Sequence, residues 1–119
     1  MKKVIILSVI VGLMTIIACS KSSTNTNNNT SATVDCNTID SRFSAVVLPI
    51  IQNNCSGGSC HSTGTANGPG PLTNFTQIKA AAASIKTSVE SGSMPKNGVL
   101  TTAQKNAISC WVSSGAQNN

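Results

Sequence analysis

Residues 20–34 cannot contribute to a packed core. The segment reads SKSSTNTNNNTSATV and is polar, nearly uncharged and low in complexity. Such a segment buries too little apolar surface to offset its chain entropy, so we expect a flexible tether. A folded domain therefore begins near Asp35, and about 80 residues remain for it. A domain of that size has a marginal core and usually needs a disulfide or a cofactor to stabilise it.

The N-terminal 18 residues predict export. Lys2 and Lys3 precede an apolar run over 4–17, which is shorter than a membrane span of roughly 20 residues and is typical of a signal peptide. The run ends in IIAC at residues 16–19, which resembles a bacterial lipobox, so Cys19 is expected to carry lipid. The alternatives are a plain signal peptide or an uncleaved anchor, with Cys19 an ordinary thiol. The expected domains are a signal peptide at 1–18, a lipidated Cys and tether at 19–34, and a folded domain at 35–119.

The charge pattern argues against a nucleic-acid partner. Without Lys2 and Lys3, the eight Lys and Arg residues become six against three Asp and Glu, a net charge of +3. The remaining cations are scattered, with no basic run and no interleaved aromatic residues, whereas a nucleic-acid interface needs a basic patch. We expect no nucleic acid to bind.

The segment CSGGSCH at residues 55–61 is the chemical feature that needs explaining. Export places the thiols in an oxidising compartment, where spare thiols tend to pair. A Cys55–Cys60 disulfide is one reading, and zinc is another, although zinc usually takes four ligands and His61 is the only His. The third reading is covalent haem attachment through Cys55 and Cys60, with His61 on the iron. The usual spacing for it is C-x-x-C-H, so two extra residues must loop out, which Gly57 and Gly58 permit.

A methionine downstream favours the haem reading. Met94 lies in SGSMP at residues 91–95, a polar, turn-rich segment where a packing role is not obvious. Thioether and imidazole together form an axial pair that raises the potential of haem iron. The alternative for Met94 is a gap-filling hydrophobic side chain.

These residues together resemble a class I c-type cytochrome, a mono-haem domain with His and Met ligands. The resemblance covers roughly residues 40–117 and departs from the family in the widened Cys pair. The segments that carry it are PIIQNNC at 49–55, CH at 60–61, SGSMP at 91–95, LTTAQ at 100–104, Trp111 and GA at 115–116. It implies an all-α fold, a small bundle of three to four short helices around one covalent haem c.

The resemblance also implies the site. Cys55 and Cys60 would form the haem thioethers, and His61 and Met94 would be the axial iron ligands. In that family a backbone carbonyl accepts the second N–H of the haem His, and the carbonyl of Pro69 or of Pro71 is the expected acceptor here.

The elements expected from sequence agree with this fold. An apolar stripe predicts a helix over 41–54, kinked or split at Pro49. Residues 63–73 predict an irregular loop, 75–91 a helix, and a capping box at 101–104 starts a last helix that ends at Gly115. Three aromatic residues and many alanines give little bulk, so a flat apolar cofactor is expected to occupy the centre.

If the last helix crosses the first, Cys110 approaches Cys36. We therefore expect a Cys36–Cys110 disulfide that ties the N-terminal edge of the domain to its C-terminal helix and stabilises a small domain. The alternative is two unpaired thiols.

A haem iron with both axial positions filled has no open site for a substrate. The expected function is therefore an electron carrier and not an enzyme, with no catalytic residues and no small-molecule substrate. Its partners would be redox proteins and the membrane, which the lipid on Cys19 reaches from the periplasmic side. Ser20, where an Asp would hint at inner-membrane retention, mildly favours the outer membrane by analogy.

Two alternatives remain open. One is a structural or adhesive lipoprotein without metal, stapled by Cys55–Cys60 and Cys36–Cys110 disulfides. The other is a haem sensor or peroxidase-like enzyme in which Met94 is not bound.

Overall fold

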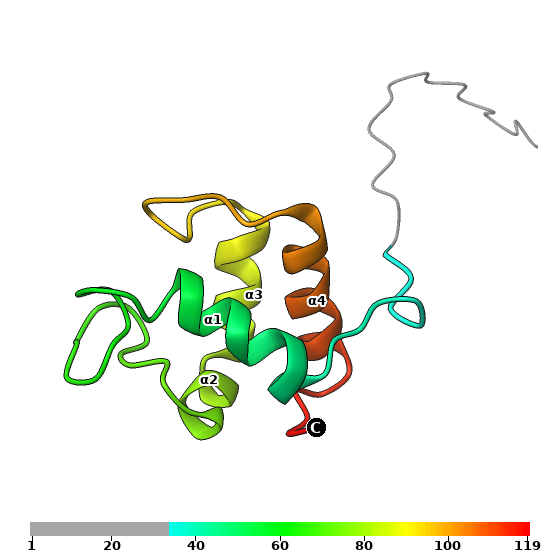
Figure 1. Ribbon diagram of the computed structural model, residues 1–119, viewed down its shortest axis with the longest axis horizontal. Helices are drawn as coiled ribbons and strands as arrows, with labels where there is room; N and C mark the ends of the chain where they lie inside the picture. The colour runs from blue at the N-terminus through cyan, green and yellow to red at the C-terminus, as the bar shows by residue number, and fades with distance from the viewer. Residues whose placement is uncertain (1–33) are drawn as a thin grey trace, which may run out of the picture. The chain divides into compact units, whose positions relative to one another are not determined.

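Five helical segments make up the regular structure of residues 34–119, which are the residues that the computed structural model describes. They are η1 (Phe43–Val47), α1 (Leu48–Asn54), α2 (Phe75–Ala80), α3 (Ala82–Glu90) and α4 (Thr102–Ser113). No β-strand occurs within this range, so the fold is all-α as predicted. In Figure 1 the helices gather on one side of the long loop that links α1 to α2.

The first helical segment is split, as the proline predicted. η1 is a five-residue π-helical stretch, and α1 continues from it with Pro49 in its first turn. Val47 and Leu48 at the junction both have helical φ and ψ, so the division is a change of helix type and not a gap. Pro49 lies just after this change, and its missing N–H removes one hydrogen bond to the preceding turn. The start of η1 is capped from the far end of the chain, since the N–H of Phe43 donates to Oδ1 of Asn119 at 2.7 Å and the N–H of Ser44 donates to its carbonyl at 2.8 Å.

The helix expected over 75–91 is interrupted. α2 ends at Ala80, α3 begins at Ala82, and the residue between them leaves the helical region with φ −95° and ψ 2°. Neither Gly nor Pro occurs in this stretch, so the local sequence gives no signal for the break. Ile78, Ile85 and Val89 are buried on either side of it, as the apolar stripe predicted.

The last helix matches its prediction closely. The hydroxyl of Thr101 accepts from the N–H of Gln104, and the Gln104 side chain accepts from the N–H of Thr101, which forms the expected capping box. Trp111 is fully buried, and its indole N–H donates to the carbonyl of Gln117 at 2.9 Å. Gly115 follows the helix with φ 92°, a conformation that glycine adopts without steric cost.

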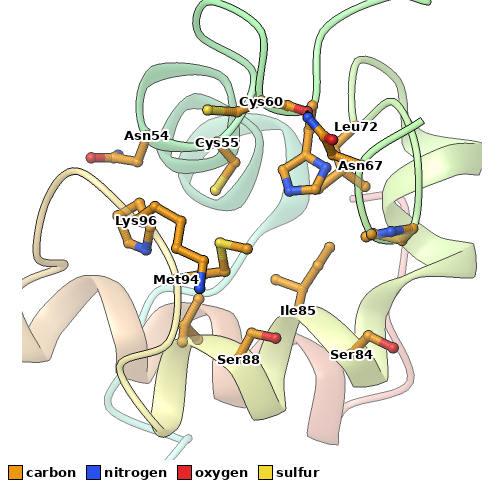
Figure 2. A pocket seen from close by; sticks show the side chains of 15 residues that line it. Asn54, Cys55, Cys60, Asn67, Leu72, Ser84, Ile85, Ser88, Met94 and Lys96 are labelled. Carbon is orange, nitrogen blue, oxygen red and sulfur yellow. The ribbon is translucent and has the colours of Figure 1, made fainter. Parts of the chain in front are cut away.

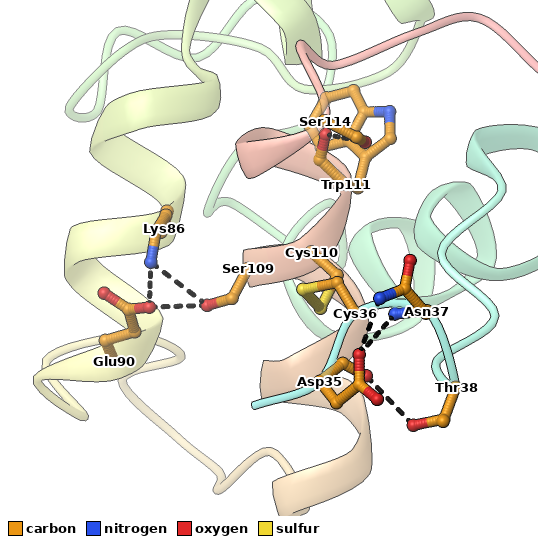
Figure 3. The surroundings of a disulfide bond; sticks show 10 residues. All are labelled: Asp35, Cys36, Asn37, Thr38, Lys86, Glu90, Ser109, Cys110, Trp111 and Ser114. Carbon is orange, nitrogen blue, oxygen red and sulfur yellow. Dashed lines mark hydrogen bonds and ion pairs between the residues drawn. A yellow bond between two sulfur atoms is a disulfide. The ribbon is translucent and has the colours of Figure 1, made fainter. Parts of the chain in front are cut away.

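α4 contacts both η1 and α3 and so lies at the centre of the packing. All three aromatic residues meet here, because the Phe43 ring lies 4.9 Å from Phe75 and 5.4 Å from Trp111. On another side of the helix, Lys86 and Ser109 both hydrogen-bond to Glu90 (Figure 3). The Lys86 ammonium and the Ser109 hydroxyl hold the pKa of Glu90 below its usual value.

Cys36 and Cys110 form a disulfide across 74 residues of sequence (Figure 3). This is the pairing expected from the sequence. Cys110 is buried within α4, whereas Cys36 is exposed and lies just inside the N-terminal limit of the described residues. The disulfide therefore joins the N-terminal segment of the described residues to α4.

Candidate functional site

A cavity of about 660 Å³ opens between α1, the loop after it, α3 and the loop that follows α3 (Figure 2). The four residues expected to hold haem, Cys55, Cys60, His61 and Met94, all line it. Its other lining residues are Asn54, Asn67, Gly68, Pro69, Leu72, Ser84, Ile85, Ser88, Val89, Pro95 and Lys96. Residues as far apart in the sequence as Asn54 and Lys96 therefore line the same cavity.

His61 is buried in the wall of this cavity, with a relative exposure of 7%. Its Nδ1 lies 2.9 Å from the carbonyl oxygen of Gly70, and because a carbonyl oxygen only accepts, Nδ1 carries the hydrogen. When the ring is neutral and Nδ1 carries its hydrogen, the other nitrogen, Nε2, has a free lone pair. A hydrogen bond of this kind fixes the orientation of a metal-binding histidine.

The partner of His61 corrects the sequence-based expectation. The carbonyl of Pro69 or of Pro71 is the acceptor expected from the sequence, but the carbonyl of Gly70, between them, accepts the hydrogen bond from His61. Gly70 has φ +84°, a conformation that turns its backbone in a way that proline, with φ near −65°, cannot follow. The ring is also covered closely, since a Cβ at Gly68 would lie 3.4 Å from Cε1 of His61.

The loop between the two cysteines is held by hydrogen bonds at both ends. The N–H of His61 donates to the carbonyl of Cys55 at 3.1 Å, and Nδ2 of Asn67 donates to the carbonyls of Ser59 at 2.8 Å and Cys60 at 3.2 Å. Gly58 has φ +60°, so one of the two glycines expected to permit the turn does adopt a left-handed conformation. The widened motif is thus an ordered loop that returns to the base of α1.

The two thiols of this loop differ in their surroundings. Cys55 follows the last residue of α1, is buried, and points into the cavity, whereas Cys60 is exposed at the rim (Figure 2). Burial raises the pKa of the Cys55 thiol, and the neighbouring Cys60 raises it further. Neither thiol is in a disulfide, in contrast to Cys36 and Cys110.

Met94 reaches the cavity because its loop is anchored on the end of α3. The N–H of Met94 donates to the carbonyl of Ser88 at 3.2 Å, and the hydroxyls of Ser91 and Ser93 donate to the same carbonyl. The chain turns at Gly92, which has φ +73°. In Figure 2 the side chain of Met94 projects toward the same space as Cys55 and Ile85. The polar, turn-rich setting seen in the sequence therefore delivers the thioether to the site.

Several lining residues were not identified from the sequence. Ser84 and Ser88 lie one helical turn apart on α3, on either side of Ile85, and their spacing at i and i+4 was the available signal. Lys96, two residues after Met94, and Asn67 gave no signal of their own. Their place in the wall depends on how the loops fold.

The donor set suits haem and not a zinc ion. Residues 34–119 contain no group of three or more His, Cys, Asp or Glu side chains placed to hold a metal ion, whereas structural zinc takes four such ligands. A haem needs fewer protein ligands, and an imidazole nitrogen, a thioether and two thiols around one chamber are those it uses. The cavity volume also falls within the range of about 300–1,000 Å³ that cofactor sites span. The residues present therefore fit a haem.

The predicted lipidation site at Cys19 and the signal peptide lie outside the described residues. Comparisons of the whole chain with protein families, with curated proteins and with solved structures found no match.

Proposed function

We propose that this chain is a membrane-tethered mono-haem c-type cytochrome that passes single electrons between redox partner proteins. One observation carries the proposal: the imidazole of His61, the thioether of Met94 and the thiols of Cys55 and Cys60 line the same cavity. The sequence separates Cys55 and Met94 by 39 residues, so their convergence is a property of the fold and not of a local motif.

Each of these residues has a role that its setting supports. His61 and Met94 would hold the iron: the hydrogen bond to Gly70 orients the imidazole of His61, and the anchored loop after α3 holds Met94. Cys55 and Cys60 would hold the cofactor covalently, because the addition of each thiol S–H across one vinyl group forms a thioether and loses no atom. When bound, haem supplies an iron that exchanges one electron. Leu72, Ile85 and Val89 provide the apolar walls that keep water away from it.

The proposal includes attachment to a membrane through lipid on Cys19, facing the periplasm, with the outer membrane mildly favoured. Within residues 34–119, no helix has the length and apolarity needed to span a bilayer. A lipid-anchored domain needs no such helix, because the acyl chains supply the membrane affinity.

The metal-free alternative, a structural lipoprotein stapled by two disulfides, requires a Cys55–Cys60 bond. Both of these residues are unpaired thiols in the structure. Their placement beside His61 gives that alternative no specific support.

An absorption spectrum combined with the intact mass of the matured protein tests the proposal. We expect haem bands that survive acid-acetone extraction and a mass that exceeds the lipidated polypeptide by one whole haem. The control is a Cys55→Ala/Cys60→Ala variant, which should release any haem on extraction. A matured, folded wild-type protein that weighs only polypeptide and acyl groups would falsify the proposal.

The distal ligand is tested by replacing Met94 with alanine. Loss of the thioether should remove the weak red-end band typical of sulfur ligation, give a high-spin or substitute-ligand spectrum and lower the reduction potential. Val99→Ala is the matched control, since Val99 lies in the same loop and is 87% exposed. An unchanged spectrum in the Met94 variant would instead favour a haem sensor or peroxidase-like enzyme in which this side chain is not bound.

A further inference from the structure

The cavity has a single charged side chain in its wall. Of the residues that line it, Lys96 alone carries a formal charge at neutral pH, and none is Asp or Glu. Asn54, Asn67, Ser84 and Ser88 supply neutral polar groups. Figure 2 shows Lys96 on the same side of the cavity as Met94. The site is therefore biased toward a ligand that brings negative charge.

Lys96 has no carboxylate partner within the described part of the chain. That part contains three acidic residues, and each is engaged elsewhere: Asp35 accepts from Asn37, Asp40 pairs with Arg42, and Glu90 pairs with Lys86. The ammonium of Lys96 is thus available, on an exposed residue at the rim.

The proposed cofactor carries two carboxylates, its propionates, on one edge. Placing a carboxylate against apolar walls is costly unless a cation or several hydrogen bonds compensate it. The neutral groups can donate hydrogen bonds but cannot offset charge, and the Asn67 amide already donates to Ser59 and Cys60.

We propose that Lys96 pairs with a haem propionate and so orients the cofactor in this cavity. The inference rests on the proposed function. It makes Lys96 a cofactor-binding residue, with a role distinct from the ligands His61 and Met94. The pair would lie at the rim, where solvent screens it, so its contribution is to orientation and local charge more than to stability.

Resonance Raman spectroscopy of the matured holoprotein tests this pairing, because the propionate bending band reports hydrogen bonding to the carboxylate. We expect the band to shift in Lys96→Gln and Lys96→Glu and to return toward the wild-type frequency in Lys96→Arg, which keeps the charge. The midpoint potential at pH 7 should fall in the order wild type, Gln, Glu, since a nearby cation favours the ferrous state. Lys105→Gln is the matched control: it makes the same charge change on a residue outside the cavity wall.

The outcomes separate the two proposals. A haem-bearing wild type whose propionate band is the same in Lys96→Gln overturns the role of Lys96 and leaves the cytochrome proposal standing. Equal band shifts in the Lys96→Gln and Lys105→Gln proteins also overturn it, because they would reflect net charge and not a contact. A wild-type protein with no haem overturns both.

Discussion

Replacing His61 with alanine should deprive the matured protein of most of its haem. Removing a group that merely orients a metal ligand typically costs about 10–100-fold in metal affinity, so removing the ligand itself should cost at least as much. The variant also loses the Nδ1–H bond to Gly70, and with it one tie between the attachment loop and the segment that covers the ring. We expect at least about a tenfold drop in haem per polypeptide, measured from the absorption spectrum.

The same variant should be less stable. Without its cofactor, the cavity lined by Leu72, Ile85 and Val89 loses the contacts of its occupant, and the stabilisation that a bound ligand contributes is lost. We expect the melting temperature to fall by about 10 °C or more.

Thr63→Ala provides the control, since Thr63 is exposed, lies two residues away and makes no side-chain hydrogen bond within the described range. Imidazole added during maturation should restore part of the haem in the His61 variant by occupying the space of the missing ring. Wild-type haem content together with a wild-type melting transition would show that His61 is not the ligand.

Breaking the Cys36–Cys110 disulfide should produce the largest loss of stability that leaves the cavity intact. The bond closes a sequence separation of 74 residues, for which the chain-entropy relation gives about 4.5 kcal/mol of stabilisation. A Cys36→Ala/Cys110→Ala variant should therefore lose about 4.5 kcal/mol in the free energy of unfolding, measured by urea titration. Alanine is the appropriate replacement because Cys110 is buried, and a serine there would add a hydroxyl that needs a partner.

The absorption spectrum should distinguish the variant that lacks this disulfide from the variant that lacks Cys55 and Cys60. Neither Cys36 nor Cys110 lines the cavity, so the variant should keep its haem bands while folded, whereas Cys55→Ala/Cys60→Ala should lose covalent haem and keep the disulfide. Thr38→Ala is the matched control in the N-terminal segment, since it removes one exposed hydrogen bond, worth about 1 kcal/mol. A double Cys variant that unfolds at the same urea concentration as Thr38→Ala would contradict the expected role of the bond.

Site residues that stand out by their own type could be predicted from the sequence, whereas those that depend on contacts between separated residues could not. The segment CSGGSCH at 55–61 and Met94 stood out in the sequence because their residue types are chemically unusual in their surroundings, and Cys55, Cys60, His61 and Met94 all line the cavity. Gly70 was missed in favour of its proline neighbours, because the hydrogen bond to His61 spans nine residues of irregular loop whose path depends on a left-handed turn. Lys96 was read only as one of several scattered charges, since no local pattern distinguishes a cation at a cavity rim from one in solvent.

The three aromatic residues illustrate the same limit. Their small number suggested that a cofactor fills the centre, yet the structure places Phe43, Phe75 and Trp111 in one cluster, none of them in the cavity wall. The packing of the helices decides whether large side chains fill the hydrophobic core or line the cavity. No short segment of sequence encodes that packing.

By itself the sequence determined the local elements of this protein: the capping box at Thr101, the glycine that follows α4 and the division of the first helix beside Pro49. These signals lie within about one helical turn, where backbone hydrogen bonds and steric limits act on adjacent residues. Only the tertiary structure decided the break at Ala81, the capping of η1 by Asn119, the burial of one thiol but not the other, and the groups that line the cavity. Those features arise from contacts between distant segments, because a buried backbone or side-chain group takes whichever partner the packing of the helices brings within reach.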